Sequence, residues 1–385
     1  MPVSVTSVRG ASPLRAEALV DGEPVWLEVD ADAEADVELP MDAIVAAFLI
    51  PAMRLGAPLV LDGPLSEKLR SHLPYVAEIV RAWWGWSGGL PIEPADTPAP
   101  SGGLLAPRLR RSALLFSGGV DSFFSLLRGP LAPDALVFVD GFDIPLDDVA
   151  RRDHAYREVR CVADAAGLRT MRVTTNLRNH SLFASASWEQ THGGALASIG
   201  HALRGEISHL MISSTPSFRE IAPSWGSHLR LDTLWSSEHL GVLYVGATHR
   251  RPEKLVAIAD EPIVRQHLRV CWEHRRPGVN CGVCEKCLRT QLLLLEHDQL
   301  RHFRTFDLST AALVDALQAL PLVRNEVTLA LSYRSLDSTR LPRAVADALK
   351  ALIDRSGAEH EQRRRASRLG GRLRSRVARL VSAPW

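Results

Sequence analysis

The chain has 385 residues but only five cysteines and four tyrosines, and it lacks any long uninterrupted apolar run. A bilayer-spanning helix needs about 18 consecutive apolar residues, so the sequence predicts no transmembrane segment. The start Met1-Pro2-Val3 does not have the pattern of a signal peptide, and we therefore expect a cytoplasmic protein. In that reducing compartment the few cysteines are candidates for metal binding or chemistry rather than for disulfides.

The chain also lacks an excess of charge of either sign, because 45 basic residues are balanced by 44 acidic ones. The net charge of +1 argues against a general polyanion-binding surface, although it allows a local one. Hydrophobic residues make up 46% of the chain and charged residues 23%, as in a soluble globular protein. This length is sufficient for two or three domains.

Residues 1–95 are predicted to form a separate small α+β domain, and the following residues 96–111, rich in proline and glycine, a linker. Asp21-Gly22 is a strong hairpin signal between two short apolar runs. Three neighbouring tryptophans, Trp83, Trp84 and Trp86, favour a packing cluster between domains over a base-stacking platform. The patterns predict strands over 4–8, 17–20 and 25–29 and helices over 42–52 and 66–84.

Strands and helices alternate through residues 112–300, which predicts an α/β fold with a doubly wound, mostly parallel sheet. Ligands of such sheets bind beyond the carboxyl ends of the strands. Cys161, in the middle of a predicted helix, is expected to be a core residue. The predicted strands are 113–116, 135–140, 169–174, 207–213 and 241–245, and the predicted helices are 147–166 and 193–204.

The stretch Ser117-Gly118-Gly119-Val120-Asp121-Ser122 follows an apolar run and opens a segment with helical spacing. A strand, a glycine turn and a helix N-terminus together form an anion site, because backbone N–H groups and the helix dipole converge on a phosphate. The two serines can add hydroxyl donors, whereas Asp121 is better suited to hold a metal ion. An ordinary tight turn between a strand and a helix is the alternative.

Four of the five cysteines fall within 17 residues: Cys271, Cys281, Cys284 and Cys287. Four thiolates on a tight loop suit tetrahedral zinc, which prefers sulfur ligands and has no redox chemistry. Such a site is closed, so the expected role is structural. An iron–sulfur cluster is the rival occupant.

The C-terminal part of the chain is predicted to be helical over residues 301–360 and to end in a basic tail, residues 361–385. Between Arg363 and Arg379 the tail has eight arginines and no acidic residue. A basic amphipathic helix, with RNA, anionic lipid or an acidic protein as its partner, is one interpretation, and a solvated tail is the other.

The glycine loop and the cysteines, in this order, resemble the PP-loop ATP pyrophosphatases, and within them the queuosine-pathway cyano-deazaguanine synthase family. The likeness covers about residues 112–295. It implies an adenine nucleotide alpha hydrolase-like, Rossmann-like domain that uses ATP to adenylate a carboxylate and then brings in ammonia. Residues 1–95, the helical C-terminus and residues 223–235 have no counterpart in the small synthase, so the native substrate stays open.

The resemblance implies that residues 117–122 (Ser117, Gly118, Gly119, Val120, Asp121 and Ser122) hold the phosphates of ATP together with Mg²⁺. It also implies that Cys271, Cys281, Cys284 and Cys287 bind Zn²⁺. Asp121 and Ser122 would then belong to the catalytic machinery.

Further candidates follow the later strands of the predicted sheet. Asp143 is expected either to accept a ribose hydroxyl or to cap the next helix. Arg178, near Asn176 and Asn179, is a candidate for bidentate contact with a phosphate or a substrate carboxylate. His192-Gly193-Gly194 is predicted to open a helix, either near the pyrophosphate or as a site of close helix packing.

Three candidates come from the region after residue 222. The loop Trp225-Gly226-Ser227-His228 is interpreted as substrate-side, with His228 as a candidate acid–base group and a packed histidine as the alternative. Arg250 and Lys254 are candidate clamps for the α-phosphate and the leaving pyrophosphate. A surface helix face is the alternative for this pair.

The predicted reaction is the adenylation, with release of pyrophosphate, of a small-molecule carboxylate or carbonyl oxygen, followed by attack of a nitrogen donor and loss of AMP. A tRNA-modifying enzyme that uses the arginine tail for phosphate contacts is a second hypothesis. A non-catalytic nucleotide-binding zinc scaffold is the third. The oligomeric state stays open, with a homodimer among the options.

Overall fold

A computed structural model describes the backbone of residues 2–12, 14–30, 37–86, 92–93, 111–220, 224–276, 279–307 and 309–381. It describes the side chains of the same residues apart from 7–11, 92–93 and 366–381. The chain divides into two compact units, Met1–Ile258 and Ala259–Trp385. The predicted linker, except Arg111, lies outside the described residues, as do Pro223 and Pro277-Gly278.

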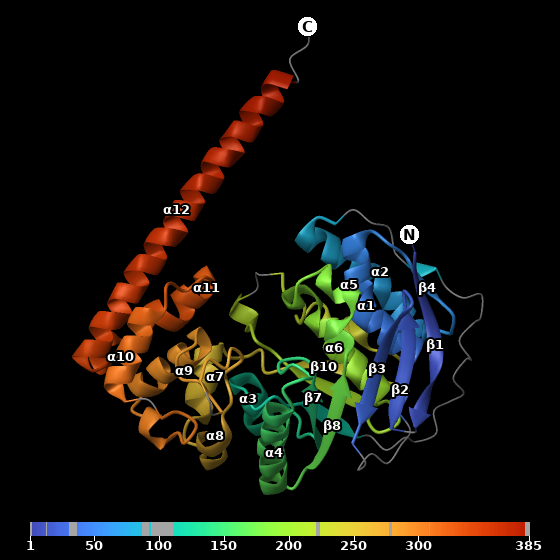
Figure 1. Ribbon diagram of the computed structural model, residues 1–385, viewed down its shortest axis with the longest axis horizontal. Coiled ribbons are helices and arrows are strands. Elements are labelled where there is room, and N and C mark those ends of the chain that lie inside the picture. The colour runs from blue at the N-terminus through green and yellow to red at the C-terminus, as the bar shows by residue number, and fades with distance from the viewer. Residues whose placement is uncertain are drawn as a thin grey trace. The chain divides into compact units, whose positions relative to one another are not determined.

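The first unit is built on a 10-stranded sheet with the order β10-β9-β6-β7-β8-β3-β2-β1-β4-β5 (Figure 1). The five strands from β10 to β8 are parallel, and β3 then pairs antiparallel to β8. The fold is therefore mixed α/β with a mostly parallel sheet. The strands are β1 Val3–Ser12, β2 Arg15–Val20, β3 Glu23–Val29, β4 Leu59–Leu61, β5 Ile92–Glu93, β6 Ser112–Leu115, β7 Ala135–Asp140, β8 Arg169–Thr175, β9 His209–Ser213 and β10 Gly241–Val245.

The predicted hairpin at Asp21-Gly22 is confirmed, and it joins β2 to β3. Both residues have a positive φ, 51° for Asp21 and 76° for Gly22. This backbone matches a type I′ turn, whose twist suits the twist of the flanking strands.

The N-terminal strands belong to the same sheet as the parallel strands, which differs from the predicted separate domain of residues 1–95. Leu27 of β3 pairs with Thr175 of β8. The Thr175 hydroxyl donates to the Trp26 carbonyl oxygen at 2.7 Å. Since β3 pairs with the edge of β8 opposite to β7, the N-terminal strands and the parallel strands share a single hydrophobic core.

Helix α1 also joins the N-terminal part to the parallel strands, since it packs along α6 (Figure 1). A Cβ at Gly194 of α6 would lie 2.1 Å from the Ala46 carbonyl oxygen of α1, so only glycine permits this approach. The helices of this unit are α1 Met41–Leu55, α2 Glu67–Trp84, α3 Val120–Arg128, α4 Val149–Ala166, α5 Ser181–Ala184, α6 Trp188–Ala202 and α7 Arg251–Ile258, with 3₁₀ turns at Leu177–Asn179, Phe218–Glu220 and Asp232–Trp235.

The buried face of α4 consists of Ala155, Val159, Val162 and Ala163. Cys161 lies off this face and is exposed, so the prediction that it is a core residue is wrong. The periodicity of the small apolar residues, rather than the character of the thiol, decides which face of α4 is buried.

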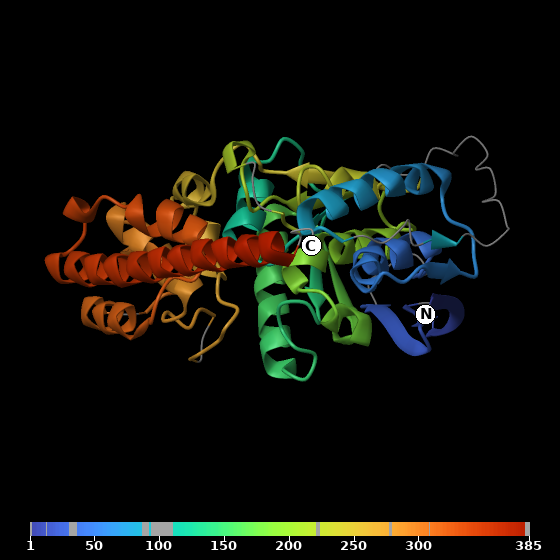
Figure 2. The same cartoon turned by 90° about the horizontal axis from the view of Figure 1, so that it is seen from above.

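The second unit is helical and has its own core, centred on Leu292, Leu317 and Tyr333. The predicted helices over 309–320, 324–335 and 342–355 are present, although α12 continues as one helix to Val381 (Figure 2). Its helices are α8 Pro262–His267, α9 Glu285–Glu296, α10 Thr310–Ala319, α11 Glu326–Leu329 and α12 Arg343–Val381, with a π-helical turn at Ala330–Arg334 and 3₁₀ turns at Leu300–His302 and Ser338–Arg340.

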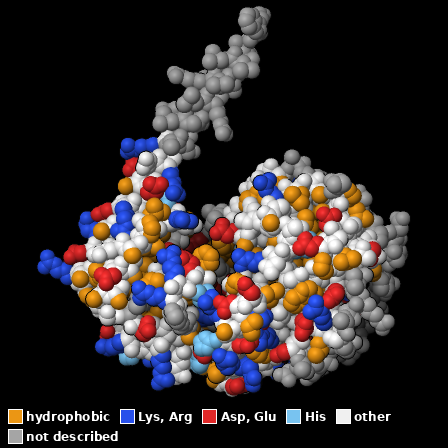
Figure 3. Space-filling view, viewed as in Figure 1, with side chains coloured by type: hydrophobic (Ala, Val, Ile, Leu, Met, Phe, Trp, Pro, Cys, Tyr) orange, Lys and Arg blue, Asp and Glu red, His pale blue; other side chains and the backbone are white. Residues whose placement is uncertain are grey.

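The side chains of residues 366–381 lie outside the described set, so the amphipathic character of the basic tail stays a prediction. Basic and acidic side chains are interspersed on the visible face in Figure 3, in keeping with the small net charge. In the described part of the chain, none of the helices has both the length and the apolar character needed to cross a bilayer.

Candidate functional site

The glycine loop connects β6 to α3, at the carboxyl end of a strand that lies between β7 and β9. Gly118 has a φ of 74°, a conformation that favours glycine. Gly119 is the N-cap of α3 in an extended conformation and brings no capping side chain. The N–H groups of the first helical turn are therefore suited to an anionic ligand.

Two cations from α7 lie on the carboxylate of Asp121, in the first turn of α3. Arg251 donates from a guanidinium nitrogen to Asp121 Oδ2, and Lys254 Nζ lies 3.3 Å from Asp121 Oδ1. The Lys254 side chain is fully buried, and that of Asp121 is 13% exposed. Both carboxylate oxygens are thus engaged by positive charge.

The Lys254 ammonium has three acceptors, which matches its three N–H donors. Besides Asp121, it donates to Ser214 Oγ at 2.9 Å and to the Ser214 carbonyl oxygen. Burial lowers the pKa of Lys254 from its usual value, while Asp121 opposes this effect. The ammonium is held in one place between the ends of β6 and β9.

Two serine hydroxyls, one of which is the Ser214 acceptor of this ammonium, lie close to Gly246. A Cβ at Gly246, just after β10, would lie 3.1 Å from Ser125 Oγ and 3.5 Å from Ser214 Oγ. The Oγ atoms of Ser125 and Ser217 are buried and have no hydrogen-bond partner among the described residues. Buried hydroxyls usually have hydrogen-bond partners, so each of these two is a candidate contact for a polar ligand.

Arg251, which was not a candidate from the sequence, contacts Asp121, whereas the proposed contact of Arg250 with phosphate stays a prediction. The Arg250 N–H donates to Glu253 Oε2 at 2.8 Å at the start of α7, and its Nε has no hydrogen-bond partner among the described residues. Arg251 and Lys254 are three residues apart and therefore share one face of the helix. This three-residue spacing was the feature of the sequence from which the pairing of Arg251 with Lys254 could have been predicted.

Of the other residues of the glycine loop, Ser122 makes a hydrogen bond within the turn itself. Ser122 Oγ donates to the Gly119 carbonyl oxygen at 3.0 Å, and Val120 is buried. Ser117 is half-buried on the loop. In this state the Ser122 hydroxyl supports the start of α3.

Arg178 lies at the carboxyl edge of the sheet but contacts the protein. Its guanidinium donates to the Phe142 carbonyl oxygen and lies 4.6 Å from the centre of the Trp188 ring. Asp143 is exposed, and α4 is capped instead by Asp148, whose carboxylate accepts the Arg151 N–H at 3.2 Å. The capping alternative for Asp143 is therefore wrong, and its contact with a ribose stays a prediction.

The segment His192-Gly193-Gly194 lies inside α6, which begins at Trp188 with a capping box formed by Ser187 and Gln190. A Cβ at Gly193 would lie 1.9 Å from the Gly226 carbonyl oxygen. The predicted helix start and N-cap at this segment are wrong, because Ser187 caps α6, whereas the close packing expected of its glycines is confirmed.

His228 is packed rather than presented to a ligand. Its ring lies 4.9 Å from that of Trp83, and its Nδ1 accepts the Arg230 N–H at 3.1 Å. Burial lowers the pKa of His228. These contacts favour the packing alternative over an acid–base role. The tryptophan cluster at the end of α2 packs against this loop within one unit instead of between domains.

Asp232 fixes the same loop and was not a candidate from the sequence. It is fully buried and accepts hydrogen bonds from Ser227 Oγ at 2.7 Å and from the His228 N–H at 3.0 Å. Burial raises the pKa of Asp232 to about 7, because the two donors only partly offset the loss of hydration.

We expect this carboxylate to destabilise the protein as the pH rises. The folded protein binds the Asp232 proton more tightly than the unfolded chain, so its contribution to stability is present below about pH 4 and is lost by about pH 7. Relative to Asp232→Asn, the wild type should lose roughly 2–3 kcal/mol of unfolding free energy between pH 5 and pH 8. Urea unfolding of both proteins at these pH values measures the difference. Asp164→Asn, at an exposed position of α4, is the control, and an equal change in Asp232→Asn and wild type would contradict the expectation.

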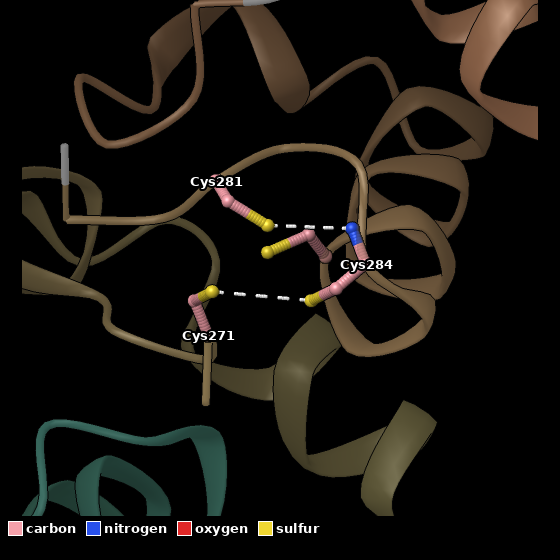
Figure 4. A group of neighbouring side chains, drawn as sticks. Cys271, Cys281 and Cys284 are labelled. Carbon is pink, nitrogen blue, oxygen red and sulfur yellow. Dashed lines mark hydrogen bonds between the residues drawn. The ribbon is translucent and has the colours of Figure 1, made fainter. Parts of the chain in front are cut away.

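In the second unit, the four predicted cysteines come together as a candidate metal site. Their sulfur atoms all lie within 4.8 Å of one another, and all four residues are buried. Figure 4 shows the side chains of Cys271, Cys281 and Cys284 directed toward a common centre. The Cys271 and Cys284 sulfurs are 3.9 Å apart, well beyond the disulfide length of about 2.05 Å.

Backbone N–H groups also point at these sulfurs. His274 donates to Cys271 Sγ at 3.2 Å, and Cys284 donates to Cys281 Sγ at 3.3 Å. Hydrogen bonds from Cys284 and Cys287 lower the pKa of the Cys271 thiol. Hydrogen bonding to Cys271 raises the pKa of the Cys287 thiol in turn.

Two buried amides fix the cysteine loop, and the sequence pattern did not indicate them. Asn280 Oδ1 accepts the N–H groups of Val270 and Cys271 at 2.8 and 3.0 Å, and its Nδ2 donates to the Leu268 carbonyl oxygen. Gln291 Nε2, on α9, donates to the Gly282 carbonyl oxygen at 2.6 Å. These contacts hold the ligands in place from outside.

Comparison with known proteins leaves the family open. No protein-family model matches the chain, and no curated protein matches its sequence. A solved structure of a type III CRISPR defence DNA nuclease activated by cyclic oligoadenylate aligns at 17% identity and a TM-score of 0.21. The alignment covers 86% of this chain and 57% of the nuclease chain. A TM-score this low does not indicate a shared fold.

Proposed function

We propose that the protein is a PP-loop ATP pyrophosphatase that adenylates a carboxylate or carbonyl oxygen and then transfers nitrogen to it. The observation that carries this proposal is the meeting of three elements at one sheet edge. The glycine loop before α3 offers N–H donors to phosphate. Asp121 offers a carboxylate for Mg²⁺, and Arg251 and Lys254 offer positive charge beside it.

The strand order supports a doubly wound, Rossmann-like assignment for the parallel part of the sheet. From β6, the chain proceeds to β7 and β8 on one side and then to β9 and β10 on the other. The direction of winding therefore changes between β6 and β9. Ligands of open α/β sheets bind at such a switch point, which is where the glycine loop and Ser214 meet.

In the proposed reaction, the substrate oxygen attacks the α-phosphorus of ATP, and the bond to the bridging oxygen of pyrophosphate breaks. A nitrogen nucleophile then attacks the adenylated carbon, loses a proton, and displaces AMP. The N–H groups of α3 would hold the β- and γ-phosphates, where Arg251 and Lys254 would stabilise the charge of the leaving pyrophosphate. Mg²⁺ on Asp121 would neutralise charge on the same phosphates.

The metal of the cysteine site is proposed to be zinc. A tetrahedral zinc ion with Zn–S bonds of about 2.3 Å places its sulfurs about 3.8 Å apart. The 3.9 Å between Cys271 and Cys284 fits this spacing, and all four sulfurs lie within 4.8 Å. An iron–sulfur cluster places several irons between its thiolates and needs a wider set. The expected role is structural, because four protein ligands leave no open position.

The test is an assay for pyrophosphate and AMP with purified protein, Mg²⁺ and a panel of carboxylates, with and without ammonium. AMP and pyrophosphate in equal amounts, dependent on one of the carboxylates, would support the proposal. Release of ADP and phosphate would contradict it, since cleavage would then occur between the β- and γ-phosphates. A protein that binds ATP but releases no product with any carboxylate would favour the scaffold alternative.

A further inference from the structure

Asp121 is occupied by cations in the arrangement described above, although the proposed function needs the same carboxylate for a metal ion. Arg251 contacts Oδ2 and Lys254 contacts Oδ1. A divalent cation that approached this carboxylate would meet two positive charges at contact distance. Such a like-charge encounter is strongly unfavourable in a half-buried site.

The two cations differ in how firmly they are held. The Lys254 side chain has no exposed surface, and each of its three N–H donors has an acceptor in Asp121 or Ser214. The Arg251 side chain is 22% exposed and belongs to the first residue of α7. Lys254 is thus a fixed charge, whereas Arg251 has the length and the access to solvent that are needed to change partners.

We propose that Arg251 is an exchangeable counter-ion, which holds Asp121 until a nucleotide triphosphate binds and then transfers its hydrogen bonds to a phosphate. This inference rests on the proposed function. A guanidinium pairs with phosphate oxygens in a bidentate manner, so the exchange costs Arg251 no hydrogen bonds. It frees one carboxylate oxygen for the divalent cation at the moment when the phosphates supply the remaining negative charge and oxygen ligands.

The exchange makes the binding of metal and nucleotide mutually dependent. Free divalent cation should bind Asp121 weakly, and nucleotide should raise the affinity for the metal. By linkage, the metal should raise the affinity for nucleotide by the same factor, for which about 5–150-fold is typical. In the absence of nucleotide, the site would therefore bind divalent cations only weakly.

The test measures binding rather than turnover. Mn²⁺ binding is followed by electron paramagnetic resonance, first alone and then with α,β-methylene-ATP, which cannot be cleaved at the reacting bond. For wild type, we expect Mn²⁺ binding to tighten at least tenfold when the analogue is present. Arg251→Gln should bind Mn²⁺ without nucleotide at least tenfold more tightly than wild type, and it should bind the analogue at least tenfold more weakly.

Three further variants separate the effect of the Arg251 charge from that of its bidentate geometry and test whether Asp121 is the Mn²⁺ ligand. Arg251→Lys keeps the charge without the bidentate geometry, so it should still exclude Mn²⁺ while binding the analogue more weakly than wild type. Adding Asp121→Asn to Arg251→Gln should remove the gained Mn²⁺ site. Arg219→Gln removes an exposed ion pair with Glu253 and is expected to change neither affinity.

Two results would overturn the exchange while leaving the proposed function in place. In the first, wild type binds the analogue, but Arg251→Gln binds it equally well. In the second, Arg251→Gln loses affinity for the analogue but gains none for Mn²⁺, which makes Arg251 a phosphate ligand only. If wild type itself does not bind the analogue, the exchange and the proposed function are both wrong.

Discussion

Replacement of Asp121 by asparagine is expected to reduce the rate of pyrophosphate release at least about a hundredfold, the usual cost of removing a group that stabilises transition-state charge. Asparagine keeps the size of the side chain but removes its negative charge. The proposed Mg²⁺ would then lose its protein ligand, and Arg251 and Lys254 would lose their shared counter-ion. A coupled assay for pyrophosphate under saturating ATP measures the loss.

This substitution also has a structural cost that must be separated from the catalytic one. Lys254 is fully buried, and loss of its charged partner can destabilise a protein by about 3–5 kcal/mol. Urea unfolding of Asp121→Asn therefore accompanies the assay, and Asp164→Asn in α4 is the matched control. An Asp121→Asn protein that is folded and retains most of the wild-type rate would show that Asp121 does not take part in the reaction.

The parallel part of the sheet could be predicted from the sequence because its signals are local. The bounds of β7 and β10 agree with the predicted 135–140 and 241–245, since each strand is a short apolar run bounded by turn residues. The glycine loop and the four cysteines are likewise local motifs, the cysteines falling within 17 residues. Each of them places its candidate ligands within a short stretch of the sequence.

The union of the N-terminal strands with the parallel sheet could not be predicted in the same way. It depends on the pairing of β3 with β8, whose partners Leu27 and Thr175 are far apart in the sequence. Any edge strand has unpaired backbone N–H and C=O groups, whatever its side chains are. The sequence of β8 therefore does not reveal which other strand pairs with its edge. The close approach of α1 to Gly194 is also a property of the pair of helices rather than of either one.

The candidate residues outside the two motifs were harder to assign because polar side chains have several uses. Arg178 contacts Phe142 and Trp188, and His228 contacts Trp83, a residue of α2. Phe142 and Trp83 belong to segments that are distant in the sequence from Arg178 and His228, respectively. The sequence indicated which residue types were available at the sheet edge, but their contacts depend on the tertiary structure.

If the four-cysteine site binds zinc as proposed, loss of this metal is expected to unfold the second unit locally while the first unit stays folded. Cys284 is the N-cap of α9 and Cys287 lies in its first turn, so a metal at this site would tie the preceding loop to a helix that carries the core residues Leu288 and Leu292. Structural zinc sites contribute about 10–16 kcal/mol of apparent binding free energy, comparable with the total stability of a domain. Cys284→Ser should therefore lose its zinc and become sensitive to protease around residues 270–300.

Cys161→Ser is the matched control for this prediction, because Cys161 is exposed and lies outside the cluster. It should keep one zinc per chain by elemental analysis and the protease resistance of wild type. A chelator added to wild type should produce the same protease sensitivity as Cys284→Ser. Added zinc should restore the resistance, because all four ligands lie on one loop and at the start of the helix that follows it. If Cys284→Ser contains no metal yet resists protease as wild type does, the amide contacts of Asn280 and Gln291 alone hold the loop, and the metal has another role.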